Sequence, residues 1–171
     1  MKLLQSIFVP LVIICFAAVL RLMPHPANVA PIAAMALFGG AYLSKRYALV
    51  VPLIALFLSD LFLGFHSTMV FVYASFFCVG LVGMTLKGRV TWQAVVVASL
   101  VSSLLFFVIT NFGVWLVSGM YPKSLAGLME CYYFAIPFFR NTIIGDLGFT
   151  ALFFGGYAVI LRTIPQRLLA K

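Results

Sequence analysis

The feature that most constrains this chain is a series of long, uninterrupted apolar segments. The longest runs from about Gln93 to Ser118 and contains no charged side chain. Continuous apolar runs of about 18 or more residues are typical of helices that cross a lipid bilayer, whereas membrane strands alternate apolar and polar residues over about ten positions. The pattern therefore predicts an all-α integral membrane protein, folded as one bundle of about six transmembrane helices.

Six such segments follow one another, and we interpret residues 1–171 as a single transmembrane domain. The second segment is short for a perpendicular span at about 1.5 Å per residue. It could extend back through Asn28, tilt, thin the bilayer or be re-entrant. Residues 119–137 are expected to form a loop with room for a short helix after Pro122. The predicted spans cover about 3–23, 31–44, 48–65, 69–86, 93–118 and 138–163.

Composition agrees with this class, because 65% of the residues are hydrophobic and only 8% are charged, against roughly 25% charged residues in a soluble domain. The net charge of +8 therefore does not indicate a nucleic-acid partner, and the lipid bilayer is the expected environment. Lys2, the following apolar run and the small residues Ala17 and Ala18 could instead form a signal peptide. The length of the run and Arg21 at its end favour a membrane span.

Lys and Arg are distributed unequally between the two sides of the predicted bundle. One side has Arg21, Lys123 and Arg140. The opposite side has the larger group, which comprises Lys2, Lys45, Arg46, Lys87, Arg89, Arg162, Arg167 and Lys171. The positive-inside rule makes the side with the larger group cytoplasmic. Both termini are therefore expected in the cytoplasm.

The external side collects nearly all of the unusual polar residues. Pro24 and Pro26 restrict the backbone around His25, so its imidazole would be presented from a stiff turn. A mostly apolar pocket with a few placed polar groups is the usual form of a small-molecule site. We therefore predict an outward-facing substrate site. Its candidate residues are Arg21, His25, Asn28, Asp60, Tyr73, Asn111, Trp115, Arg140, Asn141 and Asp146.

Each of these residues also has a purely structural interpretation. Ionisable side chains within spans are costly and usually have partners, so Asp60 or Asp146 could pair with Arg140 or Arg21 and fix the helix packing. Trp115 and the nearby tyrosines could form an ordinary aromatic belt at the membrane interface. In that case the chain would be a structural or assembly protein whose polar cluster only holds the helices together.

Catalytic and metal-binding motifs are missing from the sequence. It contains no HExxH, no GxSxG and no GxxxxGK[ST] segment. A metal site built from His25, His66, Asp60 and Cys131 is conceivable, but no pair of ligands has the i, i+4 spacing of a helical metal site. We therefore predict a protein that is not an enzyme, with no catalytic residue, no metal site and no cofactor.

Small residues predict close helix packing. Gly39–Gly40 and Gly155–Gly156 lie in apolar segments, and Ala94, Ala98 and Ser102 have the i, i+4, i+8 spacing of one helix face. Such residues let membrane helices approach each other closely. Tight packing in the cytoplasmic half would leave the outer half for a pocket.

The string RLMPHPANVAPIAAMALFGG, together with LSDLFLGFH, TNFGVW, YPKSLAGLMECY and PFFRNTIIGD, resembles a family of small uncharacterised bacterial membrane proteins with six spans. In size, span count and outward pocket the chain is also similar to the S components of energy-coupling-factor vitamin transporters. The resemblance implies a place in the bacterial inner membrane and capture of a vitamin-like solute, such as a corrinoid, for transport.

The same resemblance implies a partner, an energy-coupling transmembrane subunit that works with ATPases. S components commonly carry an AxxxA motif in the first span for docking to that partner. The first span of this chain has none, and the nearby match from Ala30 to Ala34 lies in the second segment. Transport with the partner and transport by the chain alone both stay open.

Overall fold

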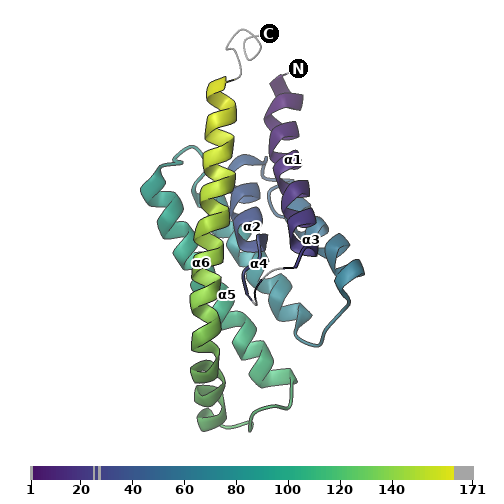
Figure 1. Cartoon of the computed structure of the whole chain (residues 1–171), viewed down its shortest axis with the longest axis vertical. Helices are drawn as coiled ribbons and strands as arrows, with labels where there is room; N and C mark the ends of the chain where they lie inside the picture. Colours follow the sequence, from purple (N-terminus) through teal and green to yellow (C-terminus); the bar gives the residue numbers. More distant parts are fainter. Residues whose placement is uncertain (1, 25, 27, 164–171) are drawn as a thin grey trace.

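The computed structural model describes residues 2–24, 26 and 28–163, with side chains from residue 8 onward. This part of the chain contains six helices and no strand (Figure 1). The prediction of an all-α fold with six helical segments is confirmed. The helices are α1 (Lys2–Leu22), α2 (Ile32–Tyr42), α3 (Val50–Leu63), α4 (Met69–Thr85), α5 (Trp92–Val117) and α6 (Leu125–Thr163).

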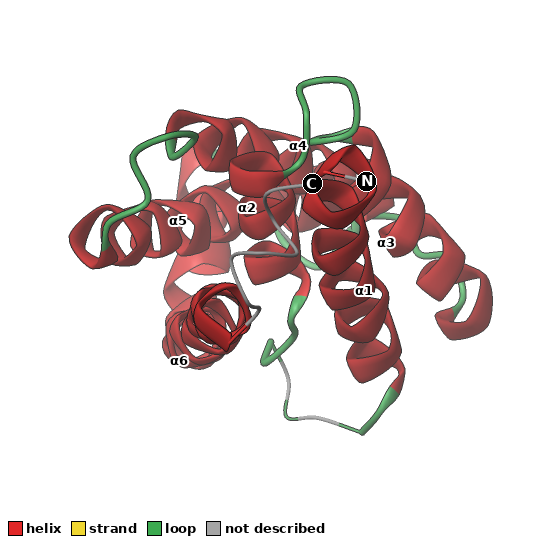
Figure 2. Cartoon of the chain, turned by 90° about the horizontal axis from the view of Figure 1, so that it is seen from above, coloured by secondary structure: helices red, strands yellow, loops and turns green. Residues whose placement is uncertain are grey.

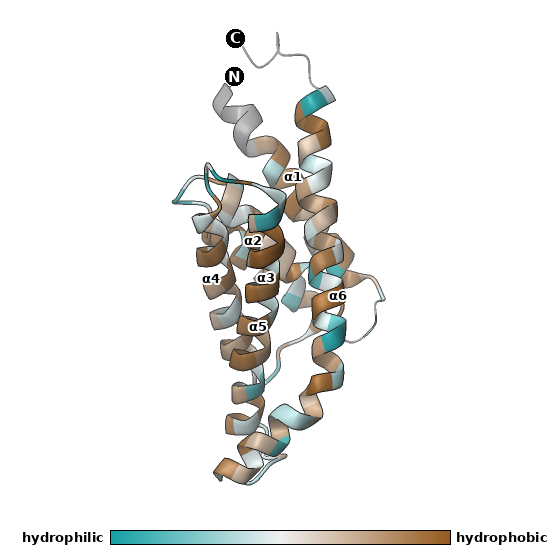
Figure 3. Cartoon of the chain, turned by 90° about the vertical axis from the view of Figure 1, so that its left-hand side faces the viewer, coloured by the Kyte–Doolittle hydropathy of each residue, from teal (hydrophilic) through white to brown (hydrophobic). Residues whose placement is uncertain are grey.

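The last helix is longer than the sequence predicts. α6 spans 39 residues and continues through Pro137, so the prediction of a loop is wrong for residues 125–137. A proline removes one backbone hydrogen bond from a helix, but the turns on either side of Pro137 stay helical. Ser124 supports the start of α6, because its hydroxyl accepts a hydrogen bond from the backbone nitrogen of Gly127 at 3.2 Å. Figure 3 shows the lower part of α6 leaning toward the end of α5.

α2 is the central helix of the bundle. It packs against all five other helices, and Figure 2 shows it in the middle of the view. Every residue from Ile32 to Ala41 is buried. The ring of Phe38 meets Phe154 and Tyr157 of α6 edge-on, with centroids 5.3 and 5.5 Å apart. A short apolar helix of this kind suits a protein core, so α2 is covered by protein and has no need to span a bilayer by itself.

Glycines allow α2 to approach α4 very closely. A Cβ atom on Gly40 would collide with the carbonyl oxygen of Gly80 and lie 2.8 Å from Cα of Gly83. A Cβ atom on Gly39 would lie 2.6 Å from Cγ of Pro52 in α3. The expected packing role of this glycine pair is therefore confirmed. Gly156 has open space around it, so the packing role expected there is not found.

The outer surface of the bundle is strongly apolar. α5 and α6 are long and apolar enough to cross a membrane, by length and composition, and the other apolar helices are shorter. Large hydrophobic side chains are exposed along the outer helices, including Phe62 at 80% and Val70 at 74%, and the apolar colouring covers much of the outside in Figure 3.

Basic residues lie at the end of the bundle where α1 begins and α6 ends. Lys45 and Arg46 follow α2, and Lys87 and Arg89 follow α4, in two connections at the upper end of Figure 1. The ammonium group of Lys87 donates a hydrogen bond to the carbonyl oxygen of Leu43 at 2.9 Å, which ties the two connections together. These four basic residues, which lie far apart in the sequence, are therefore found at the same end of the bundle.

Candidate functional site

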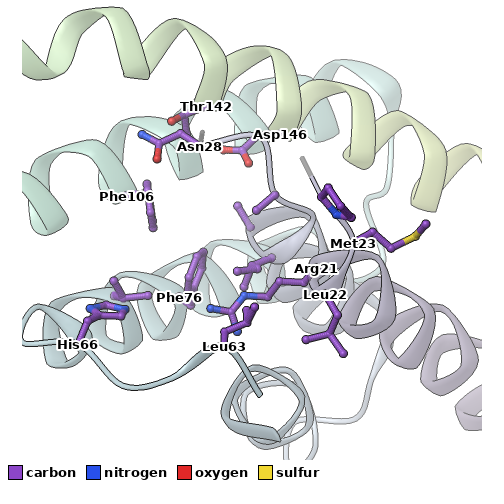
Figure 4. A pocket seen from close by; sticks show the side chains of 15 residues that line it. Arg21, Leu22, Met23, Asn28, Leu63, His66, Phe76, Phe106, Thr142 and Asp146 are labelled. Carbon is purple, nitrogen blue, oxygen red and sulfur yellow. The ribbon is translucent and has the colours of Figure 1, made fainter. Parts of the chain in front are cut away.

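A cavity of about 540 Å³ lies where α1 and α3 end and where α2 and α4 begin. α5 and α6 close its far side. The wall is mostly apolar and includes Ile32, Ala33, Val72, Phe76 and Phe106. Its polar members are Arg21, Asn28, His66, Thr142 and Asp146 (Figure 4). This volume falls in the usual range for a site that encloses a drug-sized molecule.

Arg21 reaches the cavity from the last turn of α1, but its charge is already paired. Its Nη2 atom lies 2.5 Å from Oδ1 of Asp60 on α3, and its Nη1 atom donates to the carbonyl oxygen of Leu56 at 3.2 Å and to the Ser59 hydroxyl. Asp60 is 1% exposed. The Tyr73 hydroxyl on α4 donates to its Oδ2 atom at 2.7 Å. We call Arg21, Ser59, Asp60 and Tyr73 the Arg21 cluster.

The contact at Oδ1 of Asp60 is an ion pair rather than a directed hydrogen bond, because no described donor meets hydrogen-bond geometry at this atom. Burial removes both ions from water, so each depends on the other. The Arg21 cluster therefore joins α1, α3 and α4 at one side of the cavity. The alternative that Asp60 pairs with Arg21 and fixes the helix packing is confirmed as far as the ion pair itself.

Asp146 stands on α6, on another side of the cavity, and is 3% exposed. The Ser103 hydroxyl of α5 donates to its Oδ2 atom at 2.7 Å. Behind this contact, the hydroxyls of Ser99 and Thr150 lie 3.3 Å apart. Within the described residues, Asp146 has no ion pair, and its side-chain hydrogen bond is at Oδ2. Asp146 is thus a buried carboxylate on the cavity wall, and its Oδ2 atom accepts a hydrogen bond from Ser103.

Asn28 lies in the connection between α1 and α2. Its backbone has φ of 62°, a left-handed conformation that Asn adopts more readily than most residues. The following residue, Val29, packs against Gly145 of α6, where an added Cβ would come within 3.1 Å of its Cα atom. Figure 4 shows Asn28, Thr142 and Asp146 on the same side of the cavity. His25 lies outside the described residues, so its expected role is not tested.

The other candidate residues lie away from the cavity lining. Asn111 uses its side-chain amide within α5, where it donates to the carbonyl oxygen of Phe107 at 2.7 Å. Trp115 donates to the carbonyl oxygen of Pro122 at 2.9 Å, and the ammonium group of Lys123 sits 5.5 Å from its ring centre. Arg140 is exposed and Asn141 is partly buried. Arg21, Asn28 and Asp146 are therefore the candidates that line the cavity, with Asp60 and Tyr73 behind Arg21.

Several residues of the site were not predicted from the sequence. Thr142 lines the cavity one helical turn before Asp146, and this i, i+4 spacing is a signal that could have identified it. Ser59 and Ser103 carry no such signal, because serines are common in closely packed membrane helices. Phe76 and Phe106 carry no such signal either, because apolar residues fill most positions of their segments. In the described part of the chain, no group of three or more His, Cys, Asp or Glu side chains could hold a metal ion.

Comparison with known proteins identifies a family for this chain. No curated protein and no solved structure matches the chain. One family model matches it over residues 1–167, which is nearly the whole length. That match covers all six helices and every described residue of the cavity wall. The chain therefore belongs to the family described as a family of unknown function (DUF6580).

Proposed function

We propose that this protein is a membrane-embedded, substrate-binding transport subunit that captures a small organic solute. The observation that carries the proposal is the cavity of about 540 Å³ with a mainly apolar wall and a few polar groups. Such a composition is the usual one for small-molecule sites. The cavity lies at the end of α1 away from the N-terminus, which is the side expected to face outward.

A membrane location is supported by three separate features. α5 and α6 are long enough to cross a bilayer. Large apolar side chains cover the outer helices, whereas soluble monomers rarely expose apolar patches beyond a few hundred Å². Lys and Arg gather at one end of the bundle, which is the pattern of a cytoplasmic side. The resemblance to bacterial six-span proteins further supports the inner membrane, with both termini in the cytoplasm.

The size of the cavity supports a vitamin-like solute of modest size. Drug-sized ligands occupy pockets of about 300–1,000 Å³, and a corrinoid with its side chains is much larger than such ligands. None of the described cysteines lines the cavity. We therefore favour a solute smaller than a corrinoid. An energy-coupling transmembrane subunit with ATPases is the partner that would drive its release inside.

The Arg21 cluster supports a second candidate function. Its polar groups satisfy one another across three helices, as expected for a structural or assembly protein whose charges only hold the bundle together. The two functions give different predictions for Thr142, which lines the cavity but is not part of the Arg21 cluster. Its hydroxyl should affect solute binding in a transport subunit, whereas a structural protein would have no solute to bind.

Purification of the full chain in a mild detergent, followed by native mass spectrometry, tests the proposal. We expect a bound solute of drug-like mass, and a loss of its occupancy in Thr142→Val. Thr163→Val is the matched control, because both hydroxyls donate to the carbonyl four residues earlier at 3.2 Å but only Thr142 lines the cavity. Absence of any bound solute, together with no thermal stabilisation by a panel of vitamins, would contradict the transport function.

A further inference from the structure

We propose that the cavity selects a solute that carries a positively charged nitrogen, with Asp146 as its counter-ion. This inference rests on the proposed function and specifies its substrate class. Four of the charged side chains on the expected outer side of the bundle decide it: Arg21, Asp60, Arg140 and Asp146. Among the described residues, Arg21 and Asp60 balance each other, whereas Asp146 lines the cavity without an ion pair.

The positive charge of Arg21 on the cavity wall is balanced by Asp60. Asp60 lies 2.5 Å from the guanidinium group of Arg21, and it is 1% exposed. The Arg21 donors that are not paired with Asp60 include Nη1, which reaches the carbonyl oxygen of Leu56 and the Ser59 hydroxyl. An anionic solute would have to compete with Asp60 for Arg21. Arg21 therefore does not make the cavity a site for anions.

The other described basic residues of this side are Lys123, Arg140 and His66. Lys123 contacts the backbone and ring of Trp115 beyond the end of α5. Arg140 is exposed and is not part of the described cavity wall. His66 stands at the rim, where its Nδ1 atom and the Thr68 hydroxyl are 2.9 Å apart. No described Lys or Arg forms an ion pair with Asp146.

Asp146 is held in place for such a role. The Ser103 hydroxyl fixes its Oδ2 atom at 2.7 Å, so the carboxylate is oriented before any solute binds. Thr142 stands one turn away on the same helix. Ionisable residues in a membrane bundle are costly and usually face a partner or a substrate path. A cationic nitrogen in the cavity would supply an ionic partner, which the described residues do not give to Asp146.

The apolar wall is suited to the body of such a solute. The rings of Phe76 and Phe106 both line the cavity and stack with centroids 5.2 Å apart and planes 28° apart. Aromatic faces attract cations and pack well against other rings. The wall therefore favours a compact cation with an aromatic or otherwise apolar body.

Binding of a charge series to the purified full chain tests the inference. Tryptamine, tryptophol and indole-3-acetate share one body and carry a positive, no and a negative charge at neutral pH. Phenethylamine, 2-phenylethanol and phenylacetate repeat the series on a smaller body. We expect the amine to bind best in each series, by about tenfold or more over the alcohol, as a charge-assisted contact requires. Equal binding within both series, or no binding by either amine, would overturn the inference.

Two variants locate the preference. Asp146→Asn keeps the shape of the side chain and removes its charge, so it should abolish the advantage of the amines. Glu130→Gln is the matched control, because it removes one negative charge from an exposed position of α6. Preserved amine preference in Asp146→Asn would overturn the role of Asp146. If that variant fails to insert, the wild-type charge series still decides the inference.

The outcome is separable from that of the proposed function. A co-purified solute without a cationic nitrogen would support solute binding but overturn this inference. A co-purified organic cation that is lost from Asp146→Asn and retained by Glu130→Gln would support both.

Discussion

Asp60 and Asp146 are both buried aspartates near one cavity, yet their neighbours give them different tasks. Asp60 has a cation and a phenol as partners, whereas Asp146 has one serine among the described residues. A buried carboxylate that is paired with a cation serves packing. One that lines a cavity without an ion pair is available for a ligand. The same residue type thus acts in stability at one position and, by our proposal, in recognition at the other.

A double-mutant cycle on Arg21 and Asp60 tests the packing role. Arg21→Ala and Asp60→Ala should each lower the free energy of unfolding by about 3–5 kcal/mol, because each leaves a buried charge without its partner. The double variant should be less unstable than the sum of the two, since it leaves no charge unpaired. Thermal unfolding in detergent measures the effects, and additive losses would contradict a coupled pair.

Tyr73→Phe isolates one contact of the same cluster. The change removes only the hydroxyl that donates to Oδ2 of Asp60 at 2.7 Å. Hydrogen bonds to charged groups contribute about 1.5–3 kcal/mol, so the loss should be smaller than that in Asp60→Ala. Tyr42→Phe provides the control, because it removes a tyrosine hydroxyl that is not part of the Arg21 cluster. A larger loss in Tyr42→Phe than in Tyr73→Phe would argue against this assignment.

The sequence could predict these residue types but not their partners. Charged residues within long apolar segments are rare, so Arg21, Asp60 and Asp146 stand out in the sequence. Which of them meet depends on how each helix is rotated about its axis. Where a segment is apolar on every face, hydropathy does not fix that rotation. Asn111 and Arg140 were therefore included as candidates although the structure places them away from the cavity.

At the scale of whole helices, α2 and α6 depart most from an ordinary membrane span. α2 has 11 residues and is buried on every side, while α6 has 39 residues and contains Pro137. The sequence indicates the short length of α2 directly. It does not indicate that α6 continues through Pro137, because the usual effect of a proline is to end or bend a helix. The hydrophobic segment boundaries are otherwise reproduced within a few residues.

The contact between α2 and α4 gives a prediction at this scale. Gly40→Ala should lower the free energy of unfolding by about 1–3 kcal/mol or more, because the new methyl group would collide with the backbone of α4. Gly156→Ala makes the same chemical change in a similar glycine pair but points into open space. It should leave stability unchanged or slightly higher. Equal losses in the two variants would show that this close contact does not limit stability.

The whole molecule has two unlike ends. One carries the start of α1, the end of α6 and the basic connections after α2 and α4. The other carries the cavity mouth and the turn between α5 and α6. Sequence charge alone predicts this division, because the bias of Lys and Arg requires only the order of the segments. The depth and shape of the cavity could not be predicted, since they depend on side chains from all six helices.

Topology mapping tests this division. Single cysteines introduced near Lys45 and Lys87 should be protected from a membrane-impermeant thiol reagent in intact cells and react after permeabilisation. Cysteines near His66 and Lys123 should react in intact cells. The protein's own cysteines are first replaced by Ala. Labelling at Lys45 and His66 in the same intact cells would contradict the proposed orientation.

The central position of α2 has a consequence for biosynthesis. Phe38 is covered by Phe154 and Tyr157 of α6, which are synthesised only after α3, α4 and α5. The nascent chain therefore holds its innermost helix without these neighbours while three further helices are made. The core cannot close until α6 has left the ribosome. Chains released before α6 is made would expose the innermost helix, which the cell must recognise as unfinished.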